Sequence, residues 1–265
     1  MPEWLAVLIL GVIEGITEFL PISSTGHMLL AQNWLPYKQS EVFIAVVQSG
    51  AVLAVLMVFT ERLKQIFTRL HEPETRLFLL KLGTAFMLTV MGGLTLKKLD
   101  FRLQEDVVPI AWATLIGGVL ILVIEASLRN RELRNEVTWR VAIAIGIGQL
   151  LAIIFPGLSR SGSTILMGLA MGIKRPAVTE FSFLLGIPTL LSAGALEIVS
   201  ALKNPQETGP VDWGMLAFGS VVAAVTAFIV VRWLLKYVQT HTFNIFGWYR
   251  IVLGALILLL AKTNH

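Results

Sequence analysis

The chain reads Glu14-Gly-Ile-Thr-Glu18-Phe-Leu-Pro21-Ile-Ser23-Ser24-Thr25-Gly26-His27 at its first polar passage and Gln149-Leu-Leu-Ala-Ile-Ile-Phe-Pro156-Gly157-Leu-Ser159-Arg160-Ser161-Gly162-Ser163-Thr164 at its second. Each passage is an apolar helical segment followed by a proline and then by a cluster of hydroxyls and glycine. Charged groups inside apolar segments are costly in a membrane and are usually retained for function. The two passages therefore indicate both a candidate site and an internal repeat.

The composition is that of an integral membrane protein. The 265 residues are 55% hydrophobic and only 14% charged, whereas a soluble domain has roughly a quarter charged residues. The absence of cysteine excludes disulfides, thiolate metal sites and a cysteine nucleophile, and the net charge of +4 does not indicate nucleic-acid binding. Because Glu14 and Glu18 interrupt the first apolar segment, we expect no cleaved signal peptide and a first segment that stays in the mature protein.

Six stretches are long and apolar enough to span a bilayer, which requires about 20 mostly apolar residues. They are Val42–Phe59, Leu77–Leu96, Val107–Ile124, Ala177–Leu196, Trp213–Val231 and Phe243–Ala261. Two further apolar stretches, Trp4–Leu20 and Val141–Phe155, end at the polar passages and are followed by the short apolar pieces Met28–Leu35 and Ile165–Ile173. We interpret both as re-entrant hairpins, because non-helical backbone at membrane depth is tolerated only when it is buried in protein or lines a cavity.

The resulting order is a hairpin, three spans, a second hairpin and three more spans. Since three is odd, the second half must begin on the opposite side of the membrane from the first. The sequence therefore predicts an all-α integral membrane protein with one transmembrane domain, residues 1–265, built as an inverted repeat with halves at about 1–128 and 137–265. This design places the two hairpins face to face near the midplane.

The charges of the loops predict the orientation. Loops 60–76, 128–140, 174–175 and 232–242 hold twelve basic residues, which are Arg62, Lys64, Arg69, Arg76, Arg129, Arg131, Arg134, Arg140, Lys174, Arg175, Arg232 and Lys236. The opposite side holds six, which are Lys38, Lys97, Lys98, Arg102, Lys203 and Lys262. Because cytoplasmic loops are enriched in Lys and Arg, we expect these four loops in the cytoplasm and both termini outside it.

Glu14 and Glu18 are four residues apart and share one face of a helix. Two desolvated carboxylates on one face repel each other, so we expect them to share a proton, a metal ion or another cation. The alternative is that both lie near an interface and face water. The apolar residues that follow Glu18 leave little polar context and favour the first interpretation.

The hydroxyls of Ser23, Ser24 and Thr25 precede His27. One interpretation is structural: Ser and Thr cap helix N-termini, and a helix begins near His27. The other is functional, because bare amides at a helix N-terminus bind anions and His27 is suited to acid–base work beside a Ser and two Glu. A buried core histidine is the alternative for His27, and capping and catalysis are compatible.

The second passage has the features of a phosphate-binding site. Arg160 supplies forked charged donors, and the residues around it supply hydroxyls and backbone amides; they are Ser159, Ser161, Gly162 and Thr164. The structural alternative is that Arg160 pairs with Glu18 across the two hairpins, which does not exclude phosphate binding. For Arg250 and Lys81 we favour snorkelling to the cytoplasmic interface, and Gln48 and Gln149 either line the site or join helices.

Together these residues suit hydrolysis of a phosphate ester or anhydride at membrane depth. The alternative is a lipid-phosphate transporter or flippase, because inverted repeats with paired hairpins are also a transporter architecture. The Ser24 and His27 pair favours the hydrolase, since a carrier needs no nucleophile.

Three motifs resemble the signatures of the bacterial undecaprenyl-diphosphatase family, also called the bacitracin-resistance family. They are Glu14-x-x-x-Glu18, Pro21-x-Ser23-Ser24-Thr25-Gly26-His27 and Pro156-Gly157-x-Ser159-Arg160-Ser161-x-x-Thr164, and the resemblance extends to the pair Tyr249-Arg250 in the last span. It covers essentially the whole chain, and the two long motifs are highly specific in this order and spacing.

The resemblance implies an enzyme of the bacterial cytoplasmic membrane that converts undecaprenyl diphosphate to undecaprenyl phosphate, the carrier lipid of cell-wall synthesis. It implies that Ser24 is the nucleophile, that Arg160 binds the diphosphate and that Glu18 and His27 assist proton transfer. Ser23, Thr25, Ser159, Ser161 and Thr164 are then expected to bind substrate. Glu14 is expected either to position a group or, with Glu18, to hold a divalent cation, Mg²⁺ or Ca²⁺.

The expected partners are a polyprenyl diphosphate lipid and membrane lipid, with no nucleic acid. The resemblance favours a site that opens on the outer face of the membrane. The oligomeric state is left open, and a homodimer is one of the options.

Overall fold

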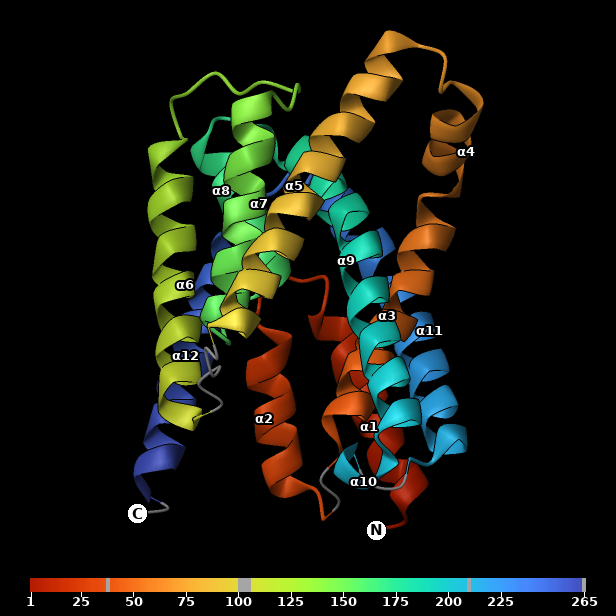
Figure 1. Ribbon diagram of the computed structural model, residues 1–265. Coiled ribbons are helices and arrows are strands. Elements are labelled where there is room, and N and C mark those ends of the chain that lie inside the picture. The colour runs from red at the N-terminus through yellow and green to blue at the C-terminus, as the bar shows by residue number, and fades with distance from the viewer. Residues whose placement is uncertain (37–38, 100–105, 209–210, 264–265) are drawn as a thin grey trace.

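Helices are the regular elements of the computed structural model, which describes residues 1–36, 39–99, 106–208 and 211–263 and forms no strand within them (Figure 1). The helices are α1 (Glu3–Thr17), α2 (Ser24–Trp34), α3 (Glu41–Val58), α4 (Thr60–Thr68), α5 (Pro73–Lys98), α6 (Val107–Ser127), α7 (Trp139–Ile154), α8 (Arg160–Ala170), α9 (Arg175–Lys203), α10 (Pro205–Thr208), α11 (Trp213–Tyr237) and α12 (Asn244–Thr263). Lys38 and Arg102, which we counted among the outer charges, lie outside the described residues.

The predicted all-α membrane class is confirmed. Six helices, α3, α5, α6, α9, α11 and α12, are long and apolar enough to cross a membrane, and each contains one of the six predicted spans almost completely. Helix ends follow ordinary signals: the Ser40 hydroxyl accepts from the Phe43 amide at 3.2 Å to cap α3, and Asp212 caps α11 in the same way at 2.9 Å. Pro73 and Pro176 lie in the first turns of α5 and α9, where no amide hydrogen is needed.

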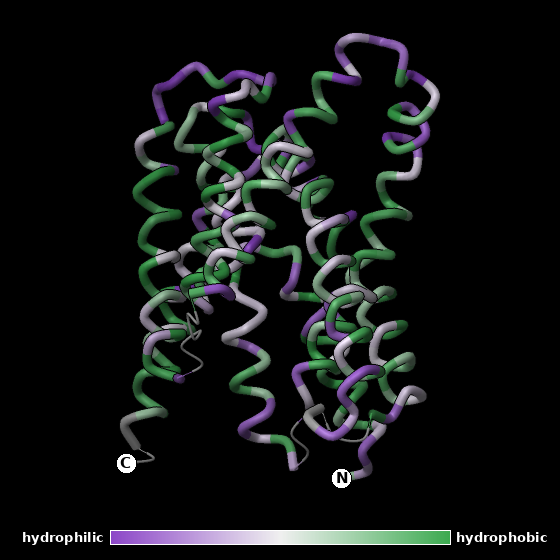
Figure 2. Tube along the Cα trace, in the orientation of Figure 1, coloured by the Kyte–Doolittle hydropathy of each residue, from purple (hydrophilic) through white to green (hydrophobic). Residues whose placement is uncertain are grey.

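The two hairpins enter from opposite ends of the bundle. Figure 1 shows α1 and α2 open toward the end where α1 begins and α12 finishes, with their connecting tip at mid-height. Helices α7 and α8 open toward the other end, and their tip also lies at mid-height. Figure 2 shows hydrophilic loops concentrated at the α7–α8 end, which is the end that holds the four arginine- and lysine-rich loops.

Close helix packing holds each first arm in place. Helix α1 lies against α11, and α7 lies against α5. Small residues allow this approach, since a Cβ atom at Gly15 would lie 2.6 Å from the Ala223 carbonyl oxygen, and one at Gly146 would lie 3.0 Å from Ala85 Cα. Such close contact replaces the hydrophobic driving force that is lacking between helices in lipid.

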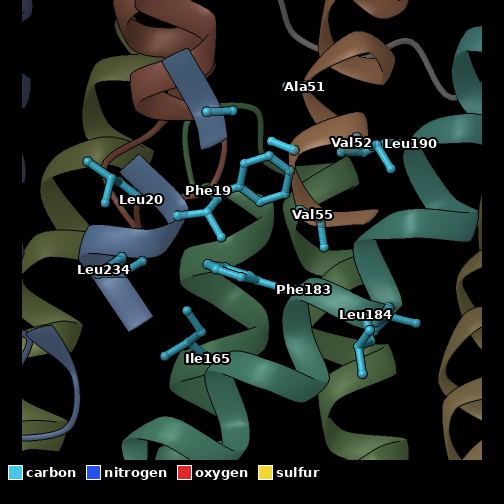
Figure 3. Packing of buried hydrophobic residues seen from close by; sticks show 14 of the residues in the cluster. Phe19, Leu20, Ala51, Val52, Val55, Ile165, Phe183, Leu184, Leu190 and Leu234 are labelled. Atoms are coloured by element: carbon cyan, nitrogen blue, oxygen red, sulfur yellow. The ribbon is translucent and has the colours of Figure 1, made fainter. Parts of the chain in front are cut away.

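An apolar cluster surrounds the tip of the first hairpin. Phe19, one residue beyond Glu18, meets Phe183 of α9 edge to face at 5.3 Å between ring centroids (Figure 3). Phe59 also meets Phe183 edge to face, at 6.5 Å between ring centroids. Val52 and Val55 of α3 complete this part of the core. The tip is therefore enclosed by side chains that exclude water from the neighbouring polar groups.

A buried ion pair ties three helices together at the charged end. Glu125 of α6 accepts from Arg175 Nε at 2.9 Å and from Nη2, and it also accepts from the Phe243 amide at 2.8 Å, just before α12. The Glu125 side chain is 1% exposed. The carboxylate therefore fixes the starts of α9 and α12 to the end of α6.

We expect Glu125→Ala to lower the free energy of unfolding by about 3 kcal/mol, because the mostly buried Arg175 guanidinium and the Phe243 amide both lose their acceptor. Thermal unfolding of the purified protein in detergent measures the effect. Glu61→Ala is the matched control: Glu61 pairs with Lys64 at 2.9 Å, but both side chains are exposed, and such pairs contribute little. Equal stability of the two variants would contradict a structural role for Glu125.

Candidate active site

The hydroxyl and glycine residues from Ser24 and from Arg160 onward form the first turns of α2 and α8, and the backbone just before them, at 18–23 and 155–159, is non-helical. Helix α2 begins at Ser24 and α8 begins at Arg160, ahead of the predicted Met28 and Ile165. Ser23 and Ser159 precede these helices in the left-handed region, with φ of 74° and 71°. This backbone conformation costs on the order of 1–3 kcal/mol and persists only where surrounding contacts hold it.

Each of these two serines caps its helix. Ser23 Oγ accepts from the Gly26 amide at 3.2 Å, and Ser159 Oγ accepts from the Gly162 amide at 3.1 Å. The capping interpretation therefore applies to Ser23 and Ser159. It leaves the next residue of each tip, Ser24 and Arg160, free to point into the space between the hairpins.

Glu18 joins the two tips. Its Oε2 accepts from Ser24 Oγ at 3.0 Å, and its Oε1 accepts from Arg160 Nε and Nη2, both at 3.2 Å. Ser24 and Glu18 are buried, at 8% and 5% exposure, and the Arg160 side chain is 11% exposed. The pairing of Arg160 with Glu18 across the hairpins, one of the two alternatives from the sequence, is thus present.

The remaining hydroxyls of the second tip bind protein groups. Ser161 Oγ lies 3.2 Å from the Glu18 carbonyl oxygen and 3.0 Å from that of Leu20, so it joins the two hairpins directly. Thr164 Oγ1 donates to the Arg160 carbonyl at 2.9 Å and lies beside the Ser182 hydroxyl. Thr25 is exposed at the start of α2. Of the predicted substrate-binding hydroxyls, Thr25 is therefore the one that faces outward.

His27 does not accept the Ser24 proton in this structure. Its Nδ1 lies 2.7 Å from the Ser23 carbonyl oxygen, which makes Nδ1 the donor, and its Nε2 lies 2.6 Å from the Tyr249 hydroxyl of α12. The two rings stack almost in parallel. Sequence reasoning placed His27 on the side of Ser24 but gave no role to Tyr249, because only the folded chain brings residues 222 positions apart together.

Glu14 fits a bound cation. It is fully buried, both of its carboxylate oxygens lack a hydrogen-bond partner, and Glu18 and Gln48 lie close enough to interact with it. No third acidic or imidazole side chain joins Glu14 and Glu18 in the described part of the chain. Two carboxylates and an amide suit a hard divalent cation that retains part of its water shell.

Gln149 joins helices. Its amide nitrogen donates to Thr89 Oγ1 of α5 at 2.8 Å and to Thr189 Oγ1 of α9 at 3.1 Å. The snorkelling predicted for Lys81 ends in an ion pair and not in water, because its side chain is 7% exposed and its Nζ lies 3.3 Å from the exposed Glu136 in the loop before α7. The same prediction is wrong for Arg250, which is 0% exposed and donates to backbone carbonyls of both hairpin tips. The carbonyls of broken helices satisfy it in place of water.

The fold and the cluster define a class: multi-pass helical membrane proteins with a charged site between two hairpin tips. Residues 7–256 match the model of the family described as bacitracin resistance protein BacA, and the chain belongs to this family. The resemblance read from the motifs is thereby confirmed.

Relatives of nearly equal length share close to half of the sequence. An undecaprenyl-diphosphatase of Rhizobium etli is 45% identical over 263 residues, which cover 99% of this chain and 98% of the relative. An undecaprenyl-diphosphatase of Xylella fastidiosa is 44% identical over 259 residues, with 97% and 98% coverage. One of Xanthomonas axonopodis pv. citri is 44% identical over 260 residues, with 98% and 97% coverage.

Proposed function

We propose that this protein is a membrane phosphatase that hydrolyses undecaprenyl diphosphate to undecaprenyl phosphate and inorganic phosphate. It would thereby recycle the carrier lipid for peptidoglycan synthesis and confer resistance to bacitracin. The observation that carries the proposal is the bond from Ser24 to Glu18, whose other oxygen is held by Arg160 of the opposite hairpin. Family membership and the undecaprenyl-diphosphatase relatives support the same reaction.

In the proposed mechanism Ser24 Oγ attacks the terminal phosphorus of the diphosphate. Glu18 accepts the hydroxyl proton as the Oγ–P bond forms, and the bridging P–O bond breaks to release undecaprenyl phosphate. Water then hydrolyses the phosphoserine to give inorganic phosphate. Arg160 donates to phosphoryl oxygens where charge develops, in a site from which Phe19 and Phe183 exclude water.

His27 has a separate role in the proposed mechanism. Its Nδ1–H is fixed by the Ser23 carbonyl, so Nε2 is the atom available for proton exchange, and Tyr249 occupies it at 2.6 Å. His27 lies in the first turn of α2, as Ser24 does, and Tyr249 lies on α12. We assign to His27 and Tyr249 the transfer of the proton between Glu18 and the solvent outside the site while water hydrolyses the phosphoserine.

A divalent cation, Mg²⁺ or Ca²⁺, would be held by Glu14 and Glu18 with the Gln48 amide oxygen. When bound, it would supply positive charge that neutralises the diphosphate. The fit rests on the buried carboxylate of Glu14, whose two oxygens make no hydrogen bond, and on the nearby Glu18 and Gln48 side chains.

We expect excess chelator to abolish phosphate release and added Mg²⁺ or Ca²⁺ to restore it. Glu14→Gln is expected to raise the cation concentration required for half-maximal activity by about 10-fold or more, because it removes a charged oxygen ligand. Titration of phosphate release against free metal measures both effects. Full activity in chelator would remove the cation from the proposal.

The inverted repeat is the architecture we propose for the whole chain, with halves at about 1–128 and 137–265. The cap geometry supports it, since Ser23 and Gly26 correspond to Ser159 and Gly162 in position and in hydrogen bonding. Helix packing supports it as well: α3 lies on α9, α6 lies on α12, and the contact of α1 with α11 matches that of α7 with α5. The charged loops favour cytoplasmic placement of the α7–α8 open end and extracytoplasmic termini.

Phosphate release by purified protein in detergent tests the function. Micelles have no second compartment, so a flippase gives no signal in this assay, whereas the phosphatase liberates inorganic phosphate from undecaprenyl diphosphate. Release that depends on Ser24 supports the phosphatase. Absence of release, together with movement of labelled lipid phosphate across the bilayer of proteoliposomes, would support the transporter alternative.

A further inference from the structure

Arg250 of α12 is a buried cation in a chain of apolar helices. Its side chain is 0% exposed, and no carboxylate pairs with it among the described residues. Its donors go to backbone carbonyl oxygens instead. They are Thr114 at 3.0 Å and Ala113 at 3.3 Å in α6, Pro21 at 3.4 Å, Gly157 at 3.1 Å and Leu158 at 2.9 Å.

These acceptors lie in both hairpin tips. Pro21 precedes Ser24 by three residues in the first tip, and Leu158 precedes Arg160 by two in the second. One guanidinium therefore bonds to the two segments that carry Ser24 and Arg160 and anchors both to α6. The planar fork of arginine suits this, because several donors of fixed geometry can reach separate acceptors, which a lysine ammonium cannot do.

The surrounding helices leave space for this side chain. A Cβ atom at Gly117 of α6 would overlap Nη2 of Arg250, and one at Gly118 would lie 2.9 Å from the Arg250 Cβ. At the second tip, a Cβ at Gly162 would lie 3.0 Å from Nη1. The guanidinium thus lies against Gly117 and Gly162, and Gly118 leaves room for the Arg250 Cβ, so the side chain is confined by all three glycines.

We propose that Arg250 is a positioning residue that sets the separation of the two hairpin tips, so that Ser24 and Arg160 meet on Glu18. The neighbouring residue, Tyr249, bonds to the first hairpin through His27 of α2, and the bridge between the two tips is made by Arg250. This inference rests on the proposed phosphatase function, and it names the residue that holds the two hairpin tips in the arrangement which that function requires. Both tips are non-helical backbone with left-handed serines, and such backbone needs partners that fix it.

The test compares Arg250→Lys with the wild-type protein by phosphate release from undecaprenyl diphosphate in detergent. We expect kcat to fall about 100-fold, since misplacement of reacting groups by about 1 Å has effects of this size, and KM to change much less. Lysine retains the positive charge, so a purely electrostatic role would leave kcat near normal. Wild-type protein without activity would argue against the proposed function instead of this inference.

A second variant displaces Arg250 without removing it. Gly117→Ala places a methyl group where Nη2 lies, and we expect it to lower kcat in the same direction. Gly83→Ala is the matched control, because a Cβ at this glycine of α5 meets no atom within 4 Å. In the double variant Arg250→Lys/Gly117→Ala the losses should not add, because both changes break the same contacts.

Each variant is assayed at a temperature well below its measured unfolding midpoint, which separates misplacement from loss of folded protein. Arg250→Lys with more than half of wild-type kcat, losses that multiply in the double variant, or a loss of kcat in proportion to the unfolded fraction would each overturn the proposal. If Arg250→Lys does not fold, the kcat of Gly117→Ala compared with that of Gly83→Ala still tests the positioning role of Arg250.

Discussion

Arg160→Ala is expected to lower phosphate release by about 10³-fold or more, since an arginine that stabilises a transferring phosphoryl group contributes 10³–10⁵ in rate. In the structure Arg160 has two nitrogens on Glu18 Oε1 and one 3.4 Å from the Ser182 carbonyl oxygen. Substrate would therefore meet a guanidinium already oriented by protein groups. Turnover and KM of the purified variant are the measurements.

Arg160→Lys should recover little of this loss. A lysine has its three donors on one nitrogen and lacks the planar fork with which arginine binds Glu18 through one edge and phosphoryl oxygens through its other donors. Since Arg160→Ala also leaves the Glu18 carboxylate buried without its partner, a fall in stability of about 3–5 kcal/mol is expected alongside. The unfolding midpoint must therefore be measured for both variants, and rates compared only where each is folded.

Arg62→Ala provides the matched control for the loss of an arginine from an ion pair. Arg62 Nε lies 2.8 Å from Glu180 Oε1 at the charged end of the bundle, and both side chains are more than a third exposed, at 41% and 36%. We expect normal turnover and almost unchanged stability. Arg160→Ala with more than a tenth of wild-type turnover would show that the diphosphate is bound elsewhere.

The fold was largely predictable because its determinants are local in the sequence. Runs of about 20 apolar residues define the six spans, and proline followed by hydroxyls and glycine marks the two tips. The prediction that α2 starts near His27 was late by one turn. Ser23 supplies the cap in a left-handed conformation that serine rarely adopts, and no propensity argument favours it.

The site was only partly predictable, because its contacts join distant parts of the chain. Glu18 and Arg160 stood out by residue type and placement, and a pairing of the two was one alternative, whereas the family resemblance implied that Ser24 is the nucleophile. The contacts of Tyr249 and Arg250 were not foreseen, since hydrogen bonds across more than 200 residues leave no local pattern. Arg250 also contradicted the usual expectation for an arginine in a span, because the broken helices provide carbonyl acceptors inside the bundle.

Ser24→Ala is expected to reduce turnover on the order of 10³-fold or more, because it removes the proposed nucleophile while the groups around it remain. The Ser24 hydroxyl makes one hydrogen bond, 3.0 Å to Glu18, and the cap of α2 belongs to Ser23. The Glu18–Arg160 pair therefore stays in place. We expect a folded variant with an unfolding midpoint near that of the wild type, and KM should change little.

Trapping the intermediate separates the two routes of attack. Acid quenching of wild-type protein during turnover, followed by mass spectrometry of the peptide containing Ser24, should detect one added phosphoryl group, and Glu18→Gln should slow its formation because the proton acceptor is lost. Ser220→Ala is the control, since this hydroxyl donates to the Leu216 carbonyl within α11 at 2.9 Å. Near-normal turnover of Ser24→Ala would instead assign the attack to water, with Glu18 as the base that activates it.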